Sequence, residues 1–114
     1  MDKSKVETFI GFAMRTGNFR IGANASATLK RAFIVIVCKS ASENTKKDAL
    51  KLANRFNCPL VETQAKTLEE ITHRENAKVM AIADKKLSVA ILENLENDIT
   101  HENLGEFKWL KKEK

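Results

Sequence analysis

Amide, hydroxyl and cationic side chains are concentrated in two short segments of the sequence. The first segment contains Gly22, Asn24, Thr28 and Arg31, and the second contains Lys39, Ser40, Ala41 and Ser42. Side chains of these types, together with free backbone amides, bind phosphates, 2′-hydroxyls and exposed base edges of folded RNA. Aromatic residues make up only 6% of the chain and Tyr is missing, which disfavours the stacking platform of single-strand binders.

Catalytic patterns do not assemble in this sequence. An enzyme needs a placed nucleophile, an acid and base, or a metal, and the chain has no GxxxxGK[ST], GxGxxG or GxSxG motif. Cys38, Cys58, His73 and His101 are too few and too scattered for a metal site. We therefore expect a protein that is not an enzyme and holds no metal or cofactor, with two buried free thiols.

The net charge of +5 lies entirely in the first half of the chain. Residues 1–48 hold nine Lys or Arg against four Asp or Glu, an excess of five, while the remaining residues hold eleven of each sign. A basic half suggests a polyanionic partner such as a nucleic acid.

The element that must position the two polar segments is the apolar run at residues 33–38, FIVIVC. An unbroken run rich in β-branched residues predicts a central strand that helices cover on both faces. Residues 39–42 follow its carboxyl end, where open α/β sheets tend to keep their sites. On a helix predicted at 24–31, Asn24, Thr28 and Arg31 share one face. Asn24 is either the N-cap of that helix or a ligand contact, and both roles are compatible.

The remaining patterns predict helices at 3–15, 43–56 and 85–94, a short helix from a Thr67–Glu70 capping box to residue 72, and strands at 18–21, 58–62 and 78–83. This order indicates the α/β class, a three-layer α/β/α sandwich with a small mixed central sheet. At 114 residues the chain fits one domain, with a folded body at 1–95 and a charged tail at 96–114. The tail either docks as a short extra helix or stays mobile.

The amino end, MDKSKVETF, lacks the layout of a signal peptide, and no apolar run approaches twenty residues. We therefore expect a cytoplasmic protein without a membrane span.

Three stretches resemble a known family. The runs GFAMRTGNFRIG, SASENTKKDALKLANRFNCPLV and HRENAKVMAIADKKLSVAIL are similar to the L-seven-Ae family of ribosomal proteins, and within it to the small bacterial YlxQ-like branch. The resemblance covers about residues 6–95. It implies an α/β/α sandwich without a cofactor that binds kink-turn or similarly bent RNA, as in ribosomal RNA.

The family signature Gly-x-Asn-Glu-x-x-Lys falls on residues 22–28. Gly22 and Asn24 match it, whereas Ala25 stands at the acidic position and Thr28 at the lysine position. In the family the Asn and Glu read guanine edges in sheared pairs, and the Lys reaches the bent backbone. By this resemblance, Arg31 would replace the lost cation.

The resemblance also implies that the loop before the last predicted strand covers the RNA. In this chain the loop is Thr72, His73, Arg74, Glu75 and Asn76. Relatives commonly have Gly near its start, where this chain has Thr72 and His73.

Two hypotheses follow for function. The first is a small, monomeric, ribosome-associated protein that recognises a kink-turn-like RNA with the helix at 22–31, the 39–42 loop and the 72–76 loop. The alternative is a protein-interaction module that kept the fold and lost its RNA, suggested by Ala25 and Thr28. That module would use the same face or the apolar residues of the 107–110 segment.

Overall fold

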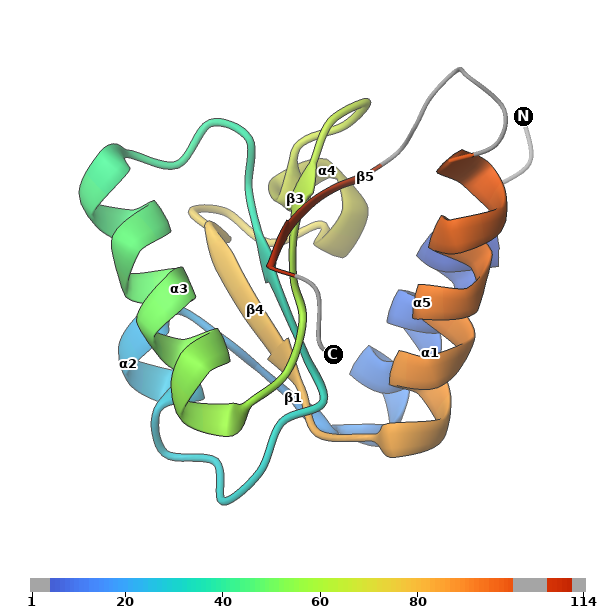
Figure 1. The fold of residues 1–114 in the computed structure, drawn as a ribbon, viewed down its shortest axis with the longest axis horizontal. Coiled ribbons are helices and arrows are strands. Elements are labelled where there is room, and N and C mark those ends of the chain that lie inside the picture. Colours follow the sequence, from blue (N-terminus) through green and yellow to red (C-terminus); the bar gives the residue numbers. More distant parts are fainter. Residues whose placement is uncertain (1–4, 100–106, 112–114) are drawn as a thin grey trace.

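The structure is a computed structural model and describes residues 5–99 and 107–111. The described elements follow one another along the chain (Figure 1). They are α1 (Lys5–Thr16), β1 (Phe19–Ile21), α2 (Ala23–Ser26), β2 (Ile34–Val37), α3 (Glu43–Phe56), β3 (Leu60–Thr63), α4 (Leu68–Thr72), β4 (Val79–Ile82), α5 (Lys85–Ile99) and β5 (Phe107–Lys111).

A mixed five-stranded sheet forms the middle of the molecule, with the strand order β1-β4-β2-β3-β5. β2 runs parallel to β3, and the other neighbouring pairs are antiparallel. All four residues of β2 are buried, because helices cover both faces of the sheet. This confirms the prediction that the apolar run at 33–38 forms the central strand.

Two helical layers enclose the sheet, α1 and α5 on one face and α2 and α3 on the other (Figure 1). Alternate residues of β2 supply the two cores. Ile36 packs on the α1 and α5 side with Ile10 and Ile91, and Val35 packs on the α3 side with Ala49. The α/β class and the sandwich predicted from sequence are therefore confirmed.

The second helix is much shorter than the prediction of 24–31, because α2 ends at Ser26. The hydroxyl of Thr28 donates a hydrogen bond to the carbonyl of Ala25 at 2.6 Å, a local bond of the kind that competes with continued helix. The chain must also leave this helix to begin β2 at the far end of the sheet. Asn24 is not the N-cap either, since that position is Gly22.

The last described segment is a strand, so both predictions for it, a short helix and a mobile end, were wrong at 107–111. β5 pairs antiparallel with β3 and covers its outer edge. Phe107, 7% exposed, joins the core, and burial alternates along the strand with a period of two. Residues 100–106 and 112–114 of the predicted tail lie outside the described residues.

No helix in the described ranges has the length and apolar character that crossing a bilayer requires.

Candidate nucleic-acid interface

Three polar segments meet at one end of the sheet, where β2 ends and β4 begins. The backbone N–H of Cys38 donates to the carbonyl of Lys78 at 2.8 Å, and that of Gly22 donates to the carbonyl of Val79 at 2.8 Å. β1 and β2 flank β4, so Gly22 and Cys38 are on the order of 10 Å apart. Residues 22–25, 39–42 and 73–76 at this end are named the sheet-edge interface.

Gly22 and Asn24 open α2 at this interface. Gly22 has a φ of +99°, a conformation that favours glycine, and its carbonyl accepts from the N–H of Ser26 at 2.9 Å. Asn24 is exposed and Ala25 is half-buried. Within the described part of the chain the amide of Asn24 has no hydrogen-bond partner. Its donor and its acceptor are therefore both available to a ligand.

The 39–42 loop is held against β3 and α3. The N–H of Lys39 donates to Oγ1 of Thr63 at 2.9 Å, and its ammonium donates to the carbonyl of Gln64 at 3.0 Å. Ala41 packs against both cores. Ser42 is the N-cap of α3, and its Oγ accepts from the N–H of Thr45 at 3.2 Å. Of the serines predicted at this helix start, Ser42 therefore caps α3.

Glu69 and Lys78 fasten two of the loops to each other. Nζ of Lys78 donates to Oγ of Ser40 at 2.9 Å and to Oε1 of Glu69 at 3.2 Å. Oε2 of Glu69 accepts from the N–H of Asn76 at 2.8 Å. Sequence reasoning missed both residues, because a lone Glu on a short helix and a lone Lys before a strand carry no periodic signal.

The 72–76 loop places four of its five residues on the surface. Thr72 is 3% exposed, and its Oγ1 donates to the carbonyl of Leu68 at 2.9 Å, so its side chain does not lie on the surface with the rest of the loop. His73, Arg74, Glu75 and Asn76 are exposed. His73 has a φ of 59° and Asn76 a φ of 60°, so both adopt a left-handed conformation, which is uncommon for residues other than Gly. The guanidinium of Arg74 lies 5.5 Å from the ring centre of Phe19.

Arg31 and Thr28 do not lie on the face predicted for them. Both are exposed, but they follow the end of α2 in the link to β2. Arg31 precedes Ile34, the first residue of β2, whereas Lys39 follows Val37, its last. The two cations therefore lie towards opposite ends of the strand, and Arg31 is outside the sheet-edge interface.

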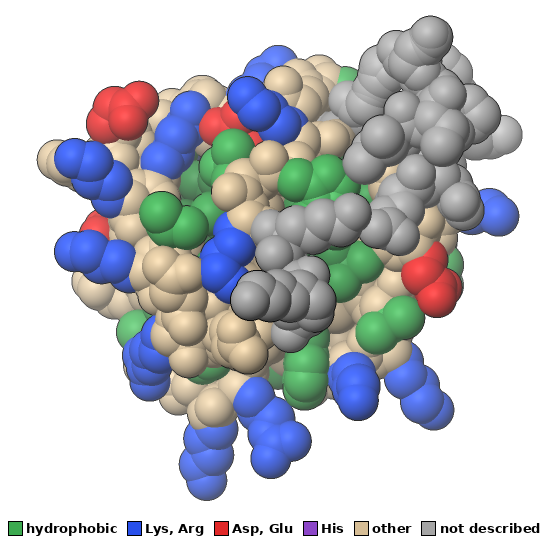
Figure 2. Space-filling view, viewed as in Figure 1, with side chains coloured by type: hydrophobic (Ala, Val, Ile, Leu, Met, Phe, Trp, Pro, Cys, Tyr) green, Lys and Arg blue, Asp and Glu red, His purple; other side chains and the backbone are tan. Residues whose placement is uncertain are grey.

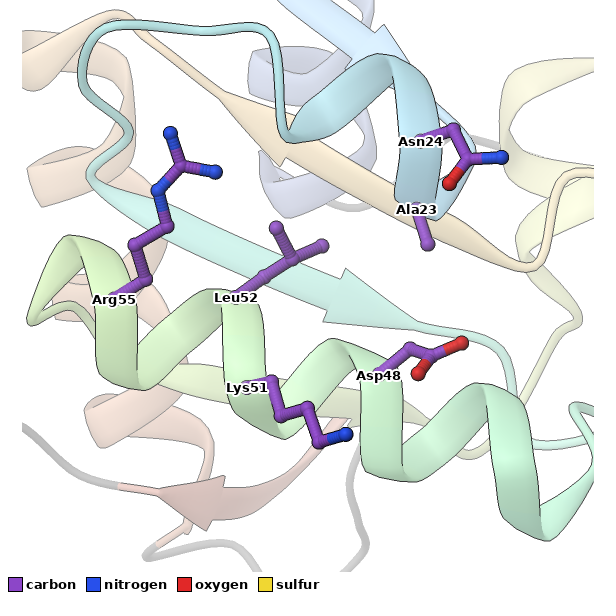
Figure 3. A pocket seen from close by; sticks show the side chains of 6 residues that line it. All are labelled: Ala23, Asn24, Asp48, Lys51, Leu52 and Arg55. Carbon is purple, nitrogen blue, oxygen red and sulfur yellow. The ribbon is translucent and has the colours of Figure 1, made fainter.

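A groove between α2 and α3 adds residues that sequence reasoning did not select. It has a volume of about 280 Å³ and is lined by Ala23, Asn24, Asp48, Lys51, Leu52 and Arg55. Figure 3 shows Asn24 and Asp48 at one end, Leu52 between the helices and Arg55 at the other end. Nη1 of Arg55 donates to the carbonyl of Ala27 at 3.0 Å. The groove thus extends from Asn24 along α3.

Cys38 has a structural role beneath the interface. Its Sγ accepts from the N–H of Leu68 at 3.3 Å and lies 3.2 Å from Oγ of Ser40. Burial raises the pKa of this thiol, but the hydrogen bonds from Ser40 and Leu68 outweigh burial and lower the pKa overall. Cys38 and Cys58 are both buried, as predicted. In the described residues, His, Cys, Asp and Glu form no group of three that could hold a metal.

Comparison with known proteins identifies the fold alone. The sequence matches no protein-family model and no curated protein. Among solved structures, it is similar to a protein of unknown function from Bacillus halodurans. The TM-score is 0.66 at 19% identity, over 80% of this chain and 96% of that chain. This likeness agrees with the α/β architecture, so the argument for function depends on the site itself.

Proposed function

We propose that this protein is a cytoplasmic, ribosome-associated monomer that binds structured RNA containing a kink-turn or a similarly sharp bend, without catalysis or a cofactor. One observation carries the proposal. The exposed amide of Asn24, which has no hydrogen-bond partner in the described part of the chain, lies at the same end of the sheet as two polar loops that Glu69 and Lys78 fasten together.

The chemistry of the sheet-edge interface suits bent RNA. An Asn side chain pairs a donor with an acceptor and so reads one base edge. The 39–42 loop at the same end of the sheet supplies the exposed cation of Lys39 and the exposed hydroxyl of Ser40. A sharp bend brings phosphates of two RNA arms close to an unpaired base. The three segments of the sheet-edge interface lie close enough together to contact such a bend at the same time. Because hydrogen bonds already order the 39–42 loop and Asn76, binding costs less conformational entropy.

The resemblance to the L-seven-Ae family supports the same proposal. Gly22 and Asn24 match its signature, and the positive φ of His73 replaces the glycine of the covering loop. Ala25 lacks the carboxylate that would read a second base, a loss of about 1–3 kcal/mol of discrimination. The family signature has a lysine where this chain has Thr28. Arg31 lies beyond the interface and does not replace that cation, so we expect moderate affinity for kinked RNA.

The decisive experiment titrates the protein against labelled kink-turn RNA and a straight duplex of equal length, at two salt concentrations. We expect the kinked RNA to bind at least about tenfold more tightly, a difference of roughly 1.4 kcal/mol. Asn24→Ala should weaken binding to the kinked RNA by about 1–3 kcal/mol and leave binding to the duplex unchanged.

Asn94→Ala is the matched control. Asn94 lies on α5, in the other helical layer, and its amide donates to the carbonyl of Ala90 at 2.8 Å. Equal affinity of the unaltered protein for both RNAs would overturn the proposal. A stoichiometric protein partner that survives nuclease treatment would then favour the protein-interaction module.

A further inference from the structure

Three cations form an inclined row along one side of α3. Lys47, Lys51 and Arg55 are spaced four residues apart and are all exposed, so they share one face of the helix, about 6 Å apart along its axis. We name this row the α3 stripe. The step between its members is close to the distance between successive phosphates along a nucleic-acid strand.

Glu43 and Asp48 lie about one turn from Lys47 and Lys51 along α3, but neither carboxylate forms an ion pair with the α3 stripe in the described structure. In the ranges that the structure describes, no carboxylate lies within ion-pair distance of Lys47, Lys51 or Arg55. The neighbouring Lys46, by contrast, forms an ion pair with Glu62 at 2.8 Å. Like charges four residues apart on a helix repel each other. A polyanion laid along the stripe would relieve that repulsion.

The α3 stripe connects with the sheet-edge interface through the groove. Asn24 lines one end of the groove, and Lys51 and Arg55 line its α3 wall. Beyond Arg55, which binds the carbonyl of Ala27, the link to β2 adds the exposed cations Lys30 and Arg31. Figure 2 shows Lys and Arg side chains along the margin formed by α3 and this link, at left and lower left.

We infer that the α3 stripe is a phosphate track, which binds the backbone of one RNA arm as that arm leaves the sheet-edge interface past Asn24. The inference rests on the proposed function and deepens it, because it assigns part of the affinity to residues outside the interface. Lys47 and Lys51 are cations on flexible stems, and Arg55 is held by the carbonyl of Ala27. None of the three reads a base edge in this arrangement, so the contact depends on phosphate charge and not on base sequence.

The test compares two double variants that remove the same charge. Lys47→Gln with Lys51→Gln removes two cations of the stripe, and Lys85→Gln with Lys86→Gln removes two exposed cations at the start of α5, in the other layer. Gln and Lys have similar helix propensities, so both variants should fold. Kinked RNA with a long duplex arm is titrated over a range of salt concentrations.

The stripe variant should lose about 1.4–1.8 from the slope of log affinity against log salt, the value for two phosphate contacts. It should bind the long-armed RNA about tenfold more weakly at low salt and keep its preference for kinked over straight RNA. Shortening the arm should weaken binding by the unaltered protein and not by the stripe variant. The Lys85 and Lys86 variant should respond to the shorter arm as the unaltered protein does.

Equal effects of the two double variants, or an unchanged salt slope in the stripe variant, would overturn the inference and leave the proposed function standing. A stripe-specific effect without any kink preference in the unaltered protein would overturn the proposed function and keep the phosphate track. Failure of the unaltered protein to bind RNA would overturn both.

Discussion

The two basic surfaces of this protein hold their lysines in different ways. At the sheet-edge interface, Lys39 donates to the carbonyl of Gln64 at 3.0 Å, and the adjoining Lys78 binds Ser40 and Glu69. On the α3 stripe, Lys47 and Lys51 have no ion-pair partner in the described residues. One surface is ordered by its own polar bonds, whereas the other is exposed charge on a helix.

The two kinds of surface are suited to different tasks, one to distinguishing ligand shapes and the other to attracting polyanions in general. Groups held in place before binding distinguish one ligand shape from another, because they cannot adapt to a wrong one without breaking bonds. Exposed cations attract any polyanion, and salt screens that attraction. We therefore expect changes at the sheet-edge interface to alter the preference for bent RNA, and changes on the α3 stripe to alter the salt dependence.

The largest effect is expected where the two surfaces share one support. Ile36 of β2 is fully buried in the core on the α1 and α5 side. β2 ends at the interface, and its other face packs against α3. Ile36→Ala should lower the free energy of unfolding by about 2–5 kcal/mol through lost burial and a cavity, as measured by urea unfolding. Val89→Ala, at a side chain 43% exposed on α5, should change it by about 0.5 kcal/mol or less.

An equal decrease in the free energy of unfolding in the Ile36 and Val89 variants would show that β2 is not the common support of the sheet-edge interface and the α3 stripe.

A smaller effect should distinguish the surfaces from each other. Glu69→Gln removes the charge that holds Lys78 at 3.2 Å and weakens the bond to the N–H of Asn76. Because the carboxylate is partly exposed, we expect a loss of about 0.5–1 kcal/mol in the free energy of unfolding. Hydrogen exchange at the amide of Asn76 should become faster, while exchange along α3 should stay the same.

Glu75→Gln makes the same chemical change at an exposed carboxylate of the same loop. Equal exchange at Asn76 in the Glu69 and Glu75 variants would show that Glu69 does not order the loop. The polar bonds of the sheet-edge interface would then give no support to the proposed selectivity.

The local pattern of the sequence accounts for most of the fold. The β-branched run predicted β2, the period of the apolar residues predicted α3 over its observed range Glu43–Phe56, and the Thr67–Glu70 pair predicted a capping box that is present. The end of α2 and the pairing of β5 could not be predicted in the same way. Both depend on contacts with distant segments, the link that must reach β2 and the open edge of β3.

The site was predictable where a segment follows directly from a strand or helix end. Gly22, Asn24 and the 39–42 loop lie where the pattern put them. Arg31 was misplaced because its face existed only on a longer helix. The link through Glu69 and Lys78 joins α4 to β4 and needs tertiary structure to be seen.

The smallest expected effect is a loss of stability in acid at the cap of α4. Two hydrogen bonds from Thr67, first from its N–H at 2.8 Å and then from its hydroxyl, lower the pKa of Glu70 below its ordinary value of 4.5. A carboxylate with a lowered pKa in the folded protein stabilises it above pH 4.5, and this contribution is lost as the pH falls through the folded value.

Glu70→Gln keeps a side chain that can accept the capping bonds but cannot titrate. Urea unfolding between pH 7 and pH 3 should therefore show a shallower acid decline for this variant than for the unaltered protein, and Glu75→Gln is again the control. Parallel declines for Glu70→Gln and the unaltered protein would contradict the charge-dependent cap. A shallower decline only in Glu70→Gln would show that the start of α4, and with it the 72–76 loop, weakens in acid. The proposed selectivity for bent RNA should then fall in acid.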